Sequence, residues 1–327
     1  MEKQEMTLTG PWPGPKGLIP EPEINPENAN LHTRKYLDEI LVEERIIDAG
    51  EADIGLTLFG ESFSSAIMMP AFSHLDKVGE NGRTPMVEYA QAAKNMSLVN
   101  WVGMEPDEEY RKIADVGART IRIIKPFADH SIVQEQIAVA EETGALAVGM
   151  DIDHVIGDNG KYDVVDGILM GTISVDGLRK LVDSTPLPFI AKGVLSISDA
   201  IKCREAGVKG IVISHHHGRM PFAIPPLMAL PEIKKALAGS GMKLFVDCGI
   251  NTGYDAYKAL ALGADAVSVG RGILPGLLKK GSSGVEEKVQ KMNEELAVLM
   301  GYTGVRNLGE MDPTVLWYHG KRMVSSN

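Results

Sequence analysis

The feature that most constrains the fold of this chain is a repeated junction, at which a glycine ends a helix-like segment and an apolar run follows. The junction occurs in "VGART", "TGALA", "AGVKG" and "LGADA". Gly117, Gly144, Gly207 and Gly263 suit the left-handed position that closes a helix, because glycine has no Cβ to clash there. A chain that repeats this junction alternates helices with buried strands, which predicts a parallel sheet covered on both faces.

The strand candidates are short, nearly continuous apolar runs. They cover residues 66–72, 96–102, 120–126, 146–153, 189–194, 210–214, 243–249 and 265–271. Eight strand–helix units in 327 residues fit a (β/α)8 TIM barrel better than an open doubly wound sheet. The lack of an early GxGxxG turn also weakens the open sheet. We therefore predict an α/β fold with a single barrel domain.

The N-terminal part of the chain differs from the rest in composition. Residues 10–30 are dense in Pro, Gly and Asn, which predicts an irregular arm, and residues 35–49 have the pattern of a helix. We expect residues 1–50 to form this arm and helix and residues 51–327 to form the barrel. The first ten residues lack an apolar segment, so no signal peptide is expected.

Composition limits the classes of partner. A net charge of -11 argues against binding to nucleic acid or to an anionic membrane, and no apolar run has the length of a membrane span. The two cysteines, Cys203 and Cys248, lack metal-type spacing, which predicts reduced thiols and a cytoplasmic location. The expected partner is a small molecule.

Polar residues follow most of the predicted strands. Because catalytic residues of TIM barrels lie at the C-terminal ends of the strands, these positions are the candidate site. They are Asn100, Lys125, Asp151, Asp153, His154, Lys192, His215 to Arg219, Asp247 and Arg271.

The last two strands carry a pattern typical of phosphate binding. "VDCGINTG" and "VGRG" place Gly249, Gly253, Gly270 and Gly272 in adjacent loops, together with Arg271. Glycine lets backbone N–H groups approach an anion, and arginine adds a forked cation. Lys192 closes a buried strand, which favours a positive charge held against a ligand.

The segment "SHHHGR" contains three adjacent histidines, which cannot all point to one place. His216 is a structural imidazole, a metal ligand or a general base. A carboxylate such as Asp153 would fix its tautomer and stabilise the imidazolium that forms on proton abstraction. For His215 and His217 we expect packing roles.

Several of these segments together resemble the FMN-dependent α-hydroxy acid oxidase and dehydrogenase family, which includes glycolate oxidase and lactate oxidase. They are "AKGVLSISDAIKCREAGVKGIVIS", "SHHHGRMPFAIPPLMALPEI", "VDCGINTGYDAYKALALGADAVSVGR" and "LAVLMGYTGVRNLGEM". The resemblance is specific from about residue 185 to the end and thinner over residues 50–155.

The resemblance implies an FMN-dependent oxidoreductase that converts a 2-hydroxy acid, or a related alcohol, to the keto product. His216 matches the catalytic base, Asp153 the residue that orients it, and Arg219 the arginine that binds the substrate carboxylate. Lys192 matches the lysine beside the flavin N1 and O2 atoms. The other cofactor-binding candidates are Pro70, Ala71, Asn100, Asp247, Gly249, Asn251, Gly270 and Arg271. Family members also suggest a homo-oligomer, a tetramer.

The chain departs from the family pattern around the substrate. Compared with the family pattern, Ile124 stands in place of an active-site tyrosine and Arg122 in place of a glutamine. The second carboxylate-binding arginine is missing, as is most of the loop after the fourth strand. His215 and His217 replace Asn and Gly. An apolar wall at Ile124 would favour a bulkier substrate, and Arg122 or an extra histidine could restore the missing charge.

Two alternatives remain open at this point. One is a metal-dependent barrel lyase or epimerase with Asp151, Asp153, His154 and His216 as ligands, although no tight ligand spacing is present and we expect no metal. The other is a flavin-binding protein with lost or altered substrate chemistry. The sequence identifies neither the substrate nor the electron acceptor.

Overall fold

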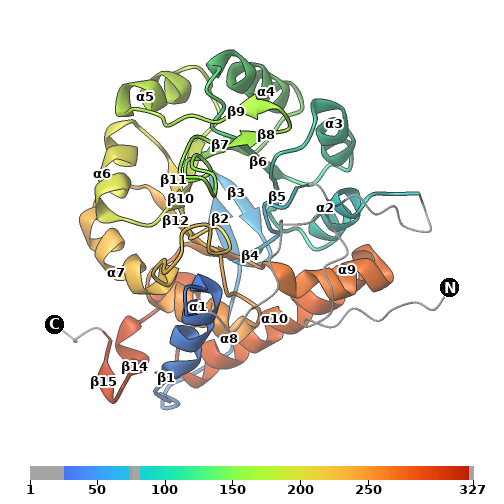
Figure 1. Cartoon of the computed structure of the whole chain (residues 1–327). Helices are drawn as coiled ribbons and strands as arrows, with labels where there is room; N and C mark the ends of the chain where they lie inside the picture. The colour runs from blue at the N-terminus through green and yellow to red at the C-terminus, as the bar shows by residue number, and fades with distance from the viewer. Residues whose placement is uncertain (1–25, 74, 76–81, 324–327) are drawn as a thin grey trace.

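The computed structural model describes residues 26–73, 75 and 82–323. Its centre is a barrel of eight parallel strands, each beside the next in chain order (Figure 1). They are β4 (Ile67–Met68), β5 (Asn100–Val102), β6 (Thr120–Ile124), β7 (Ala147–Asp151), β10 (Phe189–Val194), β11 (Gly210–Ile213), β12 (Lys243–Val246) and β13 (Ala266–Ser268). The last strand, β13, pairs with the first, β4, so the predicted TIM barrel is confirmed.

The barrel closes between β4 and β5 through single hydrogen bonds rather than a continuous ladder. The Met69 amide donates to the Val99 carbonyl (3.0 Å), and the Gly103 amide donates to the Phe72 carbonyl (2.8 Å). A Cβ on Gly103 would lie 2.9 Å from that Phe72 oxygen, so only glycine allows this approach. The result is a nearly closed barrel.

The barrel interior is filled by side chains. The Trp101 ring meets Phe245 edge-on, with centroids 5.4 Å apart, and the indole N–H points at the Met68 sulfur (3.3 Å). Trp101, Met68 and Phe245 lie on three different strands, so they fill the space between them. The interior is therefore a packed core, and chemistry is confined to the mouth of the barrel.

Helices surround the strands, as Figure 1 shows. They are α2 (Pro85–Asn95), α3 (Asp107–Asp115), α4 (His130–Glu142), α5 (Val175–Asp183), α6 (Ile197–Glu205), α7 (Pro226–Ala236), α8 (Gly253–Ala261), α9 (Leu274–Lys280) and α10 (Ser282–Tyr302). Thr84, Asp129, Ser174, Ser196 and Thr252 cap five of them, each side chain accepting a hydrogen bond from a first-turn amide. Among the described residues, no helix has both the length and the apolar character that crossing a membrane requires.

The four predicted helix-ending glycines adopt the expected conformation. Gly117, Gly144, Gly207 and Gly263 have φ values of +82°, +69°, +87° and +109°. Each follows the C-cap of its helix by one residue. The repeated junction in the sequence is therefore the helix-to-strand turn of the barrel.

The N-terminal helix is shorter than predicted. Helix α1 (Ala29–Glu39) ends where β1 (Ile40–Val42) begins, and β1 pairs antiparallel with β14 (Leu316–Tyr318), which in turn pairs with β15 (Lys321–Arg322). The prediction of a helix over 35–49 is thus wrong beyond Glu39, because pairing with the C-terminal strand overrides the local helix pattern. Residues 10–25 of the predicted arm lie outside the described residues.

The remaining short strands form two hairpins. One joins β2 (Leu56–Leu58) to β3 (Glu61–Phe63), and the other joins β8 (Val164–Val165) to β9 (Ile168–Leu169). The second lies in residues 152–174, the segment after β7, which we name the mouth loop. The sequence suggested that this loop is mostly absent, but it carries side chains that reach the candidate site.

Candidate active site

The first part of the site is a buried carboxylate at the end of β7, between two lysines from the strands on either side of it, β6 and β10. Lys125 Nζ donates to Asp151 Oδ2 (2.7 Å), and Lys192 Nζ donates to Asp151 Oδ1 (2.8 Å). The strand register brings Lys192 and Asp151 together, because Lys192 on β10 lies directly opposite Asp151 on β7. Burial alone would raise the pKa of Asp151, but the two ammonium groups lower it well below its usual range. Asp151 is therefore ionised.

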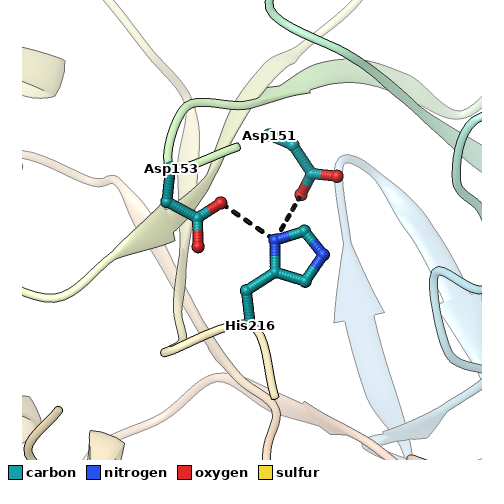
Figure 2. Close-up of side chains that lie close together, drawn as sticks. All are labelled: Asp151, Asp153 and His216. Atoms are coloured by element: carbon teal, nitrogen blue, oxygen red, sulfur yellow. Dashed lines mark hydrogen bonds and ion pairs between the residues drawn. The ribbon is translucent and has the colours of Figure 1, made fainter. Parts of the chain in front are cut away.

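The second part is the pair of His216 and Asp153. His216 Nδ1 lies 3.0 Å from Asp153 Oδ1 and 3.9 Å from Asp151 Oδ1, whereas its other ring nitrogen points away from both carboxylates (Figure 2). Burial opposes ionisation of Asp153, but His216 lowers its pKa. An ionised Asp153 accepts a hydrogen bond from Nδ1–H, so Nε2 carries the free lone pair of a base.

The third part is contributed by the mouth loop. Asp163 Oδ2 lies 3.0 Å from His154 Nε2 and 3.8 Å from Arg219 Nη1. Burial lowers the pKa of His154 to about 3, with help from the positive charges of Lys125 and Arg219, so His154 is neutral. Sequence reasoning missed Asp163, because no motif marks a carboxylate within an irregular loop.

His215 and His217 differ in their surroundings. His215 is buried; its Nδ1 accepts the Gly218 amide (2.9 Å), and its Nε2 lies 2.8 Å from Thr33 Oγ1 on α1. This histidine ties α1 to the loop after β11. His217 Nδ1 is buried without a hydrogen-bond partner among the described residues, and burial together with Arg271 lowers the pKa of this imidazole.

The glycine loops after β12 and β13 serve different purposes. Gly249 has a φ of +80°, and a Cβ there would lie 2.7 Å from Thr33 Cγ2, so this glycine permits the approach of α1. Asp255 accepts hydrogen bonds from the amides of Asn251 and Thr252, so the chain itself satisfies these amides at the start of α8. By contrast, a Cβ on Gly270 would meet no atom within 4 Å. Open space for a ligand lies there.

The structure does not support one predicted cofactor contact, that of Asn100. This residue is the first of the three residues of β5, and its side-chain amide donates to Thr120 Oγ1 (3.1 Å) on β6. Trp101, the next residue, occupies the barrel interior, and strand side chains alternate, so Asn100 faces the outer layer. Pro70, Ala71 and Asp247 do follow β4 and β12 on the mouth side.

Arg122 also points away from the mouth. Its guanidinium donates to the Gln136 carbonyl on α4 (3.0 Å) and lies 4.2 Å above the Tyr110 ring on α3. The side chain is fully buried between the barrel and these two helices. Arg122 therefore cannot supply the charge of the missing arginine.

Side chains on β6 alternate between the two faces of the strand, so the residue that faces the mouth at the position of the family's tyrosine is Lys125 and not Ile124. Ile124 lies opposite Met150 and shares the outer face with Arg122, two residues before it. The next residue, Lys125, faces the mouth and contacts Asp151. The apolar wall predicted at Ile124 is thus wrong: a buried lysine occupies that place.

The metal alternative can be judged from the same contacts. Ligand atoms of Asp151, Asp153 and His216 lie within 4.8 Å of one another. A divalent ion there would have to compete with the ammonium groups of Lys125 and Lys192, each already bound to one oxygen of Asp151. The arrangement therefore disfavours a metal centre.

Because the site disfavours a metal centre, we predict that a chelator has no effect on turnover. Dialysis of the protein against EDTA is expected to change its turnover by less than about 2-fold, because an ion pair already occupies the candidate ligands. Turnover before and after dialysis, and after addition of Mn²⁺ or Zn²⁺, checks this. Loss of activity that a divalent ion restores would contradict it.

Comparison with known proteins finds a matching family. The model of the FMN-dependent dehydrogenase family matches residues 158–318. The chain is similar to this family over these residues. It is 28% identical over 324 residues to glycolate oxidase of Spinacia oleracea, covering 87% of this chain and 85% of that protein. A match to L-lactate oxidase of Roseobacter sp. is 36% identical over 159 residues but spans only 43% of that protein.

Solved structures agree with the family assignment. A crystal structure of an arginine-to-leucine mutant of mandelate oxidase with 2-hydroxy-phenylacetamide superimposes with a TM-score of 0.77 at 26% identity, covering 86% of this chain and 87% of that one. A structure of a tyrosine-to-phenylalanine mutant of mandelate oxidase contains an FMN adduct. These comparisons support FMN as the cofactor.

The described residues fit such a cofactor. The open space beside Gly270 and the neighbouring Arg271 suit a phosphate, and burial lowers the pKa of this arginine, which a bound anion would oppose. Lys192 is buried, and although burial lowers its pKa, Asp151 and Asp247 raise it above the usual range. A permanently charged ammonium at this depth suits the polar edge of a flavin ring.

Proposed function

We propose that the protein oxidises a 2-hydroxy acid to the 2-keto acid and uses FMN as the electron acceptor. The observation that carries this proposal is the hydrogen bond between His216 Nδ1 and Asp153 Oδ1, which leaves His216 Nε2 as a base at the barrel mouth. The names of relatives support it, since they include glycolate, lactate and mandelate oxidases.

Each side chain then has one task. Arg219 holds the substrate carboxylate, and His216 Nε2 takes the proton of the 2-hydroxyl group. Asp153 stabilises the resulting imidazolium, as an ionised partner of a general base does. Lys192 supplies positive charge beside the cofactor. When bound beside Lys192, FMN would supply the acceptor for the hydride from C2.

The proposed binding residues follow from the site. Pro70, Ala71, Lys192, Asp247 and Arg271 line the mouth side of the barrel at or after four strands, and Gly270 borders the open space. Gly249 and Asn251 contribute less directly, because their contacts are mainly with α1 and α8.

The test is an absorbance measurement. Purified protein is expected to be yellow, to release FMN on heating, and to bleach under anaerobic conditions with at least one 2-hydroxy acid from a panel of glycolate, L-lactate and (S)-mandelate. The keto product is then identified by mass. A yellow protein that no hydroxy acid reduces would instead support a flavin protein with altered chemistry.

A cytoplasmic location and a homo-oligomeric assembly, a tetramer, complete the proposal. The acidic composition and the free thiols of Cys203 and Cys248 support the location. The oligomer is inferred from family resemblance. Light scattering coupled to size-exclusion chromatography measures the mass, and a monomer mass near 35.3 kDa would contradict the assembly.

A further inference from the structure

We propose that Lys125 and Arg219 together bind the substrate carboxylate, so that Lys125 replaces the arginine that this chain lacks. The inference rests on the proposed oxidation of a 2-hydroxy acid and names the residues that select its anionic group. Lys125 follows β6 and Arg219 follows β11, with β7 and β10 between these strands. The two cations therefore approach the mouth from different sides.

The ammonium group of Lys125 has more N–H donors than its single contact with Asp151 uses. An ammonium group carries three N–H bonds, and the only hydrogen-bond partner of Lys125 Nζ among residues 26–73, 75 and 82–323 is Asp151 Oδ2 (2.7 Å). The side chain is buried, where a charged hydrogen bond is stronger than in water. A carboxylate at the mouth would satisfy the remaining donors.

The surroundings of Lys125 are short of negative charge. Burial lowers its pKa, Asp151 raises it, and the positive charges of Lys192 and Arg219 lower it again. Lys125 and Arg219 both act on His154 as well, so these groups lie within electrostatic reach of one another beside His216. An added anion would relieve the repulsion among the cations.

Asp163 indicates where such an anion lies. Its carboxylate, carried by the mouth loop, faces Arg219 Nη1 at 3.8 Å and His154 Nε2 at 3.0 Å. A substrate carboxylate in that place would face the cations of Arg219 and Lys125 in the same way as the Asp163 carboxylate faces Arg219. The sequence suggested Arg122 or an extra histidine as a replacement for the charge of the missing arginine; we propose Lys125 instead.

The test compares two ligands that differ in charge but hardly in shape, (S)-mandelate and 2-hydroxy-phenylacetamide. Binding is measured by anaerobic titration calorimetry on protein loaded with FMN that has been reduced beforehand, so that mandelate is not turned over, and flavin content is checked for each variant. Lys125→Met is expected to weaken mandelate binding about 10- to 100-fold, the usual effect of losing a charged hydrogen bond, and amide binding by less than about 3-fold. Lys125→Arg keeps the charge and is expected to retain mandelate binding within about 5-fold.

Lys291→Met is the matched control, because Lys291 lies on α10 with 71% of its side chain exposed. It is expected to change neither affinity. Equal losses for mandelate and the amide in Lys125→Met would overturn the inference, since the lysine would then act only through Asp151. Wild-type protein that binds mandelate no more tightly than the amide would also overturn it. Selective mandelate binding without flavin reduction would contradict the proposed oxidation but support the carboxylate site.

Discussion

Replacing His216 with Ala is expected to slow flavin reduction by 2-hydroxy acids about 10²- to 10⁴-fold while FMN remains bound. The loss of a general base has this magnitude. Asp153 holds the imidazole by a 3.0 Å contact to Nδ1, which leaves Nε2 to take the hydroxyl proton. Stopped-flow absorbance under anaerobic conditions measures the rate, and the flavin-to-protein ratio verifies that the cofactor is retained.

His215→Asn is the control for this prediction. His215 neighbours the base in sequence, but its ring nitrogens meet the Gly218 amide and the Thr33 hydroxyl. Its loss is expected to lower the free energy of unfolding by about 1–3 kcal/mol, the cost of leaving buried polar groups unpaired, and to change the reduction rate by less than about 3-fold. If His215→Asn abolished reduction and His216→Ala did not, the assignment of the base would be wrong by one residue.

Replacing Lys192 with Met is expected to have the second largest effect, a fall of about 10²-fold in the rate of flavin reduction. Removing one fixed, buried charge that stabilises developing negative charge has this scale. Asp151 and Asp247 raise the pKa of Lys192 despite its burial, so the ammonium stays charged throughout the neutral range. The same loss should lower the midpoint potential of the flavin, because the cation favours the reduced, anionic form.

Spectroelectrochemistry of the FMN-loaded variant measures that potential. Lys192→Arg retains the charge and is expected to recover part of the rate and most of the potential. Lys125 remains to neutralise Asp151 in Lys192→Met, through the 2.7 Å contact, so the protein is expected to fold. A variant with normal potential and a rate within about 3-fold of wild type would show that Lys192 serves only to hold Asp151.

The sequence by itself predicted the barrel and most of the strand ends that carry chemistry. Glycines such as Gly117 and Gly263 mark helix ends through a backbone conformation that other residues avoid, so their meaning is local. Lys192 and His216 were also found from sequence, because they lie in or shortly after apolar runs and because long segments around them match a known family.

Only the tertiary structure decided which side chains face the mouth on β6 and what the mouth loop contributes. A shift of one residue exchanges the two faces of a strand, so Ile124 and Lys125 could not be told apart within the apolar run "TIRIIKP". Asp163 contacts Arg219 because the mouth loop turns back toward the loop after β11. Helix α1 ends at Glu39 because β1 pairs with a strand some 275 residues later in the chain. Such contacts join distant segments, and their geometry depends on packing rather than on any local pattern of residues.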